Sequence, residues 1–183
     1  RRQRQMCIRA RAVSGGWNPN VHLTCHHRGR PRWQEDIAAF VPGDGVPAGM
    51  NVAGAARGIF STAGALADGQ AAALAHLSDL GIKAAQARLP EAEDAPVGIT
   101  PLWHVGGTKR AWLDQQNDVT VKDVGLAHQE NFRAVEHLKR YTTLGMAGDQ
   151  GRTSNVLGLA IMAELTGKTI AETGTTIYRP PYT

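Results

Sequence analysis

The residues best suited to chemistry lie in one polar segment between two helical patterns. Residues 137–155 read HLKRYTTLGMAGDQGRTSN and combine cations, hydroxyl groups, a Gln-Gly pair and further glycines. Cationic and hydroxyl side chains bind phosphate oxygens, whereas a hydrophobic core excludes them. The segment therefore suits a phosphate group or the acidic edge of a cofactor.

A second candidate site lies at the junction of an apolar run and a long helical pattern. The residues Met50–Ala53 predict a short strand, Gly54–Gly58 a glycine-bearing turn, and the stretch from Ser61 to about Leu80 a helix of small residues. Such a junction aims backbone N–H groups and the positive helix end at one point, which favours a phosphate. The spacing is not a full G-x-G-x-x-G, so a tight packing turn is the alternative.

The sequence predicts neither catalytic residues nor a metal site. His26 and His27 are adjacent, so their side chains diverge, while His22 lies in an apolar strand pattern. His128 and His137 are expected on helix surfaces. No Ser-His-Asp or Cys-His arrangement stands out by spacing.

The elements that position the polar segment follow from capping signals. Thr120 and Asp123 predict a capping box at the start of VKDVGLAHQEN, and RAVEHLKRY predicts a second helix. Ser154 or Asn155 is expected to cap the apolar helix VLGLAIMAELTG, which Gly167 ends. A further capping box is expected at Thr169 and Glu172, and Asp123 is interpreted as a cap partner rather than a general base.

Two other stretches organise the chain. Residues 89–98 (LPEAEDAPVG) form an acidic, proline-containing linker, and LWHV is expected to pair with KRAWLD as a hairpin across Gly106-Gly107. The final TTIYRPPYT predicts an extended connector.

Composition limits the classes of partner. The net charge is +4, but five arginines among the first 11 residues account for it, and no aromatic residues interleave with them. Nucleic-acid binding is therefore not expected. The two cysteines form no C-x-x-C pair, and no apolar run approaches the ~18 residues of a membrane span. We expect a soluble, cytoplasmic protein without membrane contact.

Several motifs, in order, resemble the alpha subunit of heterotetrameric sarcosine oxidase. They are SGGWNPNVHL, VAGAARGIFSTAGALADG, QNDVTVKDV, HLKRYTTLGMAGDQGRTSN and GTTIYRPPYT. The resemblance implies an α/β plus α fold: a partial FAD/NAD(P)-binding domain of Rossmann type over residues 1–88, a linker over 89–100, a small domain of hairpin and helices over 101–174, and a connector over 175–183. The connector would lead to an aminomethyltransferase-like domain, and the chain would be a fragment, inactive alone.

The small domain also resembles [2Fe–2S] domains of related dehydrogenases. Alignment on Val119-Thr120 and Gly145-Met146 places Asp114, Gln116, Asp149 and Ser154 at the four cysteine positions. Because an iron–sulfur cluster needs thiolate ligands, the resemblance implies a scaffold that has lost its cysteines and holds no cluster.

The resemblance further implies the cofactors and partners. NAD would bind this subunit at Gly54, Ala55, Ala56 and Gly58, FMN would lie at the interface with the beta subunit, FAD in the beta subunit, and tetrahydrofolate in the aminomethyltransferase-like domain. The FMN-facing residues would be Lys139, Arg140, Thr142, Thr143, Gln150, Arg152, Thr153 and Ser154. The alternative is that Thr142 and Ser154 cap helices while Lys139 and Arg140 are solvated.

The expected function is that of an oxidoreductase subunit in a complex with beta, gamma and delta subunits. The complex would demethylate sarcosine to glycine, transfer the one-carbon unit to tetrahydrofolate, and reduce oxygen to hydrogen peroxide. Two alternatives stay open: a subunit of a related amine or opine oxidase or dehydrogenase, and a non-catalytic docking module for a flavin subunit.

Overall fold

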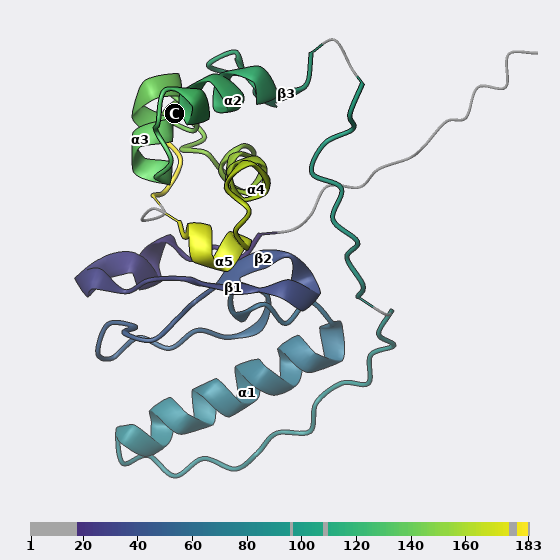
Figure 1. The fold of residues 1–183 in the computed structure, drawn as a ribbon. Coiled ribbons are helices and arrows are strands. Elements are labelled where there is room, and N and C mark those ends of the chain that lie inside the picture. Colours follow the sequence, from purple (N-terminus) through teal and green to yellow (C-terminus); the bar gives the residue numbers. More distant parts are fainter. Residues whose placement is uncertain (1–17, 96, 108–109, 176–178, 183) are drawn as a thin grey trace, which may run out of the picture.

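The computed structural model describes residues 18–95, 97–107, 110–175 and 179–182. Within them, two small antiparallel sheets combine with helices, and the largest helical group lies at one end of the molecule (Figure 1). No helix in these ranges has both the length and the apolar character to cross a membrane.

The first sheet is a hairpin that contributes to the main core. After the 3₁₀ helix η1 (His22–Arg28), strand β1 (Arg32–Gln34) leads through η2 (Glu35–Ile37) into β2 (Ala39–Val41). Trp33 pairs with Phe40 across the hairpin, and all of β2 is buried. His22 therefore lies in a helical turn, because the local 3₁₀ bonds replace the strand expected there.

The long helix of small residues forms as predicted. Helix α1 (Thr62–Asp79) begins after Ser61, whose hydroxyl oxygen accepts a hydrogen bond from the Gly64 amide. No residue of α1 is buried, and in Figure 1 the helix lies at the edge of the molecule with the following extended segment beside it.

The expected strand at Met50–Ala53 does not form. A strand needs a neighbour for its backbone groups, and none of the described residues pairs with this stretch. The expected turn is instead a short 3₁₀ helix, η3 (Gly54–Arg57), which ends at Gly58 with φ 92°. No parallel sheet is present within the described ranges.

Among the described residues, which leave out 108 and 109, the predicted hairpin across Gly106-Gly107 is not found. Strand β3 (Trp112–Asp114) pairs with β4 (Val119–Thr120) instead. The reason is Asp114, whose Oδ1 accepts hydrogen bonds from the amides of Gln116 and Asn117 and so closes a turn after β3.

The helical group follows the capping signals closely. It comprises α2 (Val121–Gln129), α3 (Val135–Thr142), α4 (Asn155–Thr166) and α5 (Ile170–Thr173). Both capping boxes are confirmed: the backbone amide and hydroxyl of Thr120 donate to Asp123, and those of Thr169 donate to Glu172. Gly167 ends α4 in the left-handed conformation, as expected.

The cap expected from the Ser154 hydroxyl is absent. Ser154 stands at the N-cap position of α4, but its side chain makes no capping bond. Ser154 is completely buried, and its Oγ atom has no hydrogen-bond partner among the described residues. Burial against α4 therefore decides the position of this side chain.

The core joins stretches on both sides of the acidic linker. One cluster lies among α2, α3 and α4 and contains Leu138, Leu144 and Met162. In a second cluster, Phe40 of β2 packs with Val135, Val156 and Leu159, with Trp33 and Trp103 beside them. Because burial of one such side chain contributes about 1.5–3 kcal/mol, the β1–β2 hairpin is anchored on the helical group.

Candidate anion-binding site

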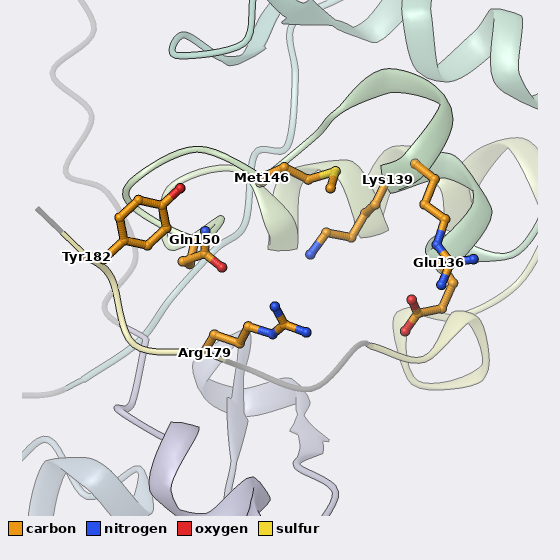
Figure 2. A pocket seen from close by; sticks show the side chains of 8 residues that line it. Glu136, Lys139, Met146, Gln150, Arg179 and Tyr182 are labelled. Carbon is orange, nitrogen blue, oxygen red and sulfur yellow. The ribbon is translucent and has the colours of Figure 1, made fainter.

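A pocket of about 500 Å³ lies where the loop between α3 and α4 meets the C-terminal segment. Figure 2 shows side chains reaching it from both sides. Its lining residues are Glu136, Lys139, Arg140, Gly145, Met146, Gln150, Arg179 and Tyr182.

Helix α3 supplies the charged wall of the pocket. Glu136, Lys139 and Arg140 are separated by three and four positions, so they share one face of the helix. The opposite face carries Val135 and Leu138, which are buried in the core and fix the rotation of α3. Two cations in the last helical turn also complement the partial negative charge of that helix end.

Lys139 lies partly buried in this wall. Burial lowers the pKa of its ammonium group below the ordinary 10.5, and the nearby Arg179 lowers it further, against the opposing effects of Glu136 and Asp149. In Figure 2 the ends of Lys139 and Arg179 point toward each other from opposite sides. Two cations that face each other in a partly desolvated pocket form a favourable place for an anion.

The loop between α3 and α4 is held in place from below by Asp114. The Oδ2 atom of this buried residue accepts a hydrogen bond of 2.7 Å from the Gly145 amide. Farther along the loop, the Gln116 side-chain oxygen accepts a hydrogen bond from the Asp149 amide at 3.4 Å. The turn after β3 therefore fixes the position of the loop between α3 and α4, which lines the pocket.

Two glycines shape the loop around one amide side chain. Gly145 and Gly151 have φ of 65° and 78°, and a Cβ atom on either would lie 2.2 Å from the side chain of Asn155. Only glycine combines this conformation with that close approach. The loop consequently wraps the start of α4, with Asn155 filling the space between the two glycines.

The C-terminal segment forms the remaining wall. The Tyr182 amide donates a hydrogen bond of 2.9 Å to the Gly148 carbonyl oxygen, which ties the segment to the loop. Arg179 projects from this segment into the pocket, and Gln150 projects from the loop beside it (Figure 2). The Gln150 side-chain amide also donates to the Ala147 carbonyl at 2.8 Å.

The structure brings three of the predicted loop residues into the pocket and leaves five outside its lining. Lys139, Arg140 and Gln150 line it. Three of the remaining five make local hydrogen bonds through their hydroxyl groups: Thr142 donates to the Leu138 carbonyl, Thr143 to the Thr142 carbonyl, and Thr153 to the Asp149 carboxylate. Of the other two, Ser154 is buried and Arg152 is exposed.

Sequence reasoning missed five lining residues. Glu136 was recognisable from its spacing to Lys139 and Arg140 on one helix face. Gly145 and Met146 belong to the segment singled out for chemistry. No local signal pointed to Arg179 or Tyr182, because they reach the pocket only through the folding of a distant segment.

The glycine turn before α1 donates its hydrogen bonds to carboxylates of the chain itself. The Gly54 amide donates to Asp68 Oδ2 at 2.9 Å, and Arg57 forms an ion pair with the other oxygen of Asp68 at 2.8 Å. At the start of α1 the Ala63 amide donates to Asp94, and this bond is the main cause that lowers the pKa of the Asp94 carboxyl group. Carboxylates thus occupy the places expected for a phosphate.

Of the four positions aligned with cluster cysteines, three make side-chain hydrogen bonds, whereas Ser154 Oγ has no partner among the described residues. Asp114 and Gln116 make the contacts described above, and Asp149 accepts bonds from the Gly151 amide and from both the amide and hydroxyl of Thr153. In the described part of the chain, no three His, Cys, Asp or Glu side chains gather as a metal-binding group.

One solved structure has a similar fold. L-proline dehydrogenase from P. horikoshii has a similar structure, with a TM-score of 0.62 and 22% identity over 90% of this chain and 35% of that one. At this identity the likeness concerns the fold, a mixed α/β arrangement.

The sequence comparisons are more specific. Residues 108–183 match the family described as sarcosine oxidase A3 domain. The chain is 41% identical to "Sarcosine oxidase subunit alpha" of Rhizobium meliloti (strain 1021) along 100% of its length, and 41% identical to the same subunit of Corynebacterium sp. (strain U-96) along 94%. It spans 19% of the length of each relative. The chain is therefore similar along its length to a segment of sarcosine oxidase alpha subunits, and its residues 108–183 match the A3 domain family.

Proposed function

We propose that the chain is the part of a flavin-dependent sarcosine oxidase alpha subunit that faces FMN, with the pocket between α3 and Arg179 receiving the FMN phosphate. The complete complex would oxidise sarcosine to glycine, transfer the one-carbon unit to tetrahydrofolate and reduce oxygen to hydrogen peroxide. Its partners would be beta, gamma and delta subunits, the beta subunit carrying FAD.

The observation that carries this proposal is the charge of the pocket. Lys139, Arg140 and Arg179 line it with only one carboxylate, that of Glu136, which leaves a net charge of +2 among the lining residues. A phosphate monoester carries about −1.5 to −2 charges at neutral pH and complements this balance. The Gln150 amide next to the cations provides both a donor and an acceptor for a polar cofactor edge.

FMN, when bound, supplies the electron-transfer chemistry, and the residues of this chain bind and orient it. Lys139 and Arg140 would neutralise the phosphate from α3, and the loop that carries Gly145 and Gln150 would form another side of the site. Thr143, Arg152 and Thr153 lie outside the lining, so we assign them to the support of the loop.

The decisive experiment measures FMN content in the full complex. Lys139→Gln is expected to lower the ratio of FMN to protein, because it removes a partly desolvated charge that pairs with the phosphate. Lys168→Gln is the matched control, since Lys168 is an exposed lysine in the turn after α4. Equal FMN content in both variants would refute the assignment of this pocket.

The NAD site at Gly54–Gly58 remains a separate proposal with its own test. Here NAD would have to displace the carboxylates of Asp68 and Asp94, which accept hydrogen bonds from the amides of Gly54 and Ala63. Asp68→Asn weakens this internal competition and is expected to change NAD affinity in a fluorescence titration of the full subunit. Unchanged affinity in this variant and in Asp94→Asn would exclude the turn.

Two other functions are distinguished by co-purification with a beta-type subunit. Turnover of another secondary amine or an opine in place of sarcosine would indicate a related oxidase or dehydrogenase. A complex that forms with an unaltered flavin spectrum would indicate a docking module. The exposed Met146 and Tyr182 at the pocket rim provide surface for such a contact.

A further inference from the structure

The C-terminal segment around Arg179 contributes to the pocket in a way that local sequence reasoning does not predict. Residues 179–182 are exposed and belong to no helix or strand, yet Arg179 and Tyr182 both line the cavity. We propose that Arg179 is a ligand-binding residue for a phosphate monoester, and that binding of this anion docks the C-terminal segment onto the loop between α3 and α4. This inference rests on the proposed function.

The geometry of the pocket supports the role of Arg179. Its guanidinium group faces the Lys139 ammonium group from the opposite wall (Figure 2). Neither wall alone surrounds an anion, whereas together they place cations on two sides of it. The planar guanidinium group also matches two phosphate oxygens at once.

Charge repulsion between the two walls of the pocket couples the C-terminal segment to the ligand. Arg179 and the ammonium group of Lys139 repel each other, and this repulsion contributes to the lowered pKa of Lys139. An anion between them converts the repulsion into two attractions. The segment is therefore held more firmly when the anion is present than when it is absent.

The attachment point of the segment provides a direct readout. Its backbone contact with the loop is the hydrogen bond from the Tyr182 amide to the Gly148 carbonyl. Pro180 and Pro181 have no amide hydrogen, so between residues 180 and 182 only Tyr182 exchanges. Hydrogen exchange at the Tyr182 amide therefore reports on the docking contact.

The test uses the full complex, stripped of FMN and then titrated with FMN. The variants are Arg179→Gln, Arg179→Lys and, as a matched control outside the pocket lining, Arg133→Gln. Loss of a charge-assisted contact is expected to weaken FMN binding about tenfold to a hundredfold in Arg179→Gln. Arg179→Lys should retain part of the affinity, and Arg133→Gln should bind like the wild type.

Exchange at Tyr182 provides the second measurement. FMN, and more weakly inorganic phosphate, should slow this exchange in the wild type but not in Arg179→Gln. If Arg179→Gln binds FMN normally, or if Tyr182 exchange does not respond to either anion, the inference is wrong. If Lys139→Gln lowers FMN affinity in the same experiment, the proposed function survives that failure; if it does not, both are wrong.

Discussion

The Oδ2 atom of Asp114 and the backbone amide of Gly145 are joined by a hydrogen bond of 2.7 Å between residues 31 positions apart. The other carboxylate oxygen of Asp114 accepts hydrogen bonds from the backbone amides of Gln116 and Asn117. One buried carboxylate thus closes the turn after β3 and fixes the loop that forms the pocket floor.

Removal of this carboxylate should destabilise the protein. In Asp114→Ala, the Gly145 amide loses its acceptor in a buried place, which costs about 1–3 kcal/mol. Urea unfolding of the subunit measures the loss, and Asp114→Asn should show a smaller one because its amide oxygen still accepts. The exposed Gln115→Ala serves as the control. A loss no larger than that of the control would contradict the role given to Asp114.

Substitutions at Gly151 and Gly167 distinguish the cost of a steric clash from the cost of backbone strain. Both have positive φ, but a Cβ on Gly151 would lie 2.2 Å from Asn155, whereas a Cβ on Gly167 meets nothing within 4 Å. Gly167→Ala should cost about 1 kcal/mol from strain alone. Gly151→Ala should cost clearly more and should also lower FMN content, since the loop must move. Equal thermal shifts would contradict the close packing described for this loop.

The lowered pKa of Lys139 predicts unusual reactivity. A lysine whose pKa is lowered has more neutral amine at a given pH, so the pH midpoint for its acylation should lie below 10.5. Mass spectrometry after labelling at several pH values measures this midpoint, with exposed Lys168 as the comparison. Bound FMN should raise the midpoint and protect Lys139. A midpoint equal to that of Lys168, unaffected by FMN, would contradict the site.

The lowered pKa of the Asp149 carboxyl group predicts that the protein loses stability in acid. Burial raises the pKa of its carboxyl group, but bonds from Thr153 and Gly151 outweigh this effect and the net pKa is below 3.8. Because the folded pKa lies below the unfolded one, the stabilising contribution is present above the unfolded pKa and is lost as pH falls through the folded pKa. Thermal melts between about pH 6 and pH 3 should therefore be flatter for Asp149→Asn than for the wild type. The exposed loop residue Asp44, replaced by Asn, is the control; identical pH profiles for wild type and Asp149→Asn would show that the bonds contribute nothing.

The NAD proposal is tested with carboxylate variants because a substitution of Gly58 would perturb the fold. A Cβ at Gly58 would lie 2.7 Å from Val41 and 3.0 Å from Ile37, in a backbone conformation with φ 92°. Any larger residue there disturbs the β1–β2 hairpin before it can report on a ligand. Asp68→Asn leaves the side-chain shape unchanged.

Local signals predicted the helices well and the strands poorly. The capping pairs Thr120–Asp123 and Thr169–Glu172 form within a few residues, so the sequence alone specifies them. The strand at Met50–Ala53 and the hairpin across Gly106-Gly107 depended on partners elsewhere in the chain. In the second case the side chain of Asp114 created a competing turn, and pairing moved to Val119 and Thr120.

The sequence by itself determined the helix starts, the glycine stop of α4, and the polar segment with Lys139, Arg140 and Gln150, because each depends on neighbours along the chain. Only the tertiary structure decided that Arg179 completes the pocket, that Ser154 faces the core, and that Asp68 and Asp94 hold the amides around α1. These contacts join residues that are distant in sequence. Their formation depends on how the whole chain packs, which no local pattern of residues encodes.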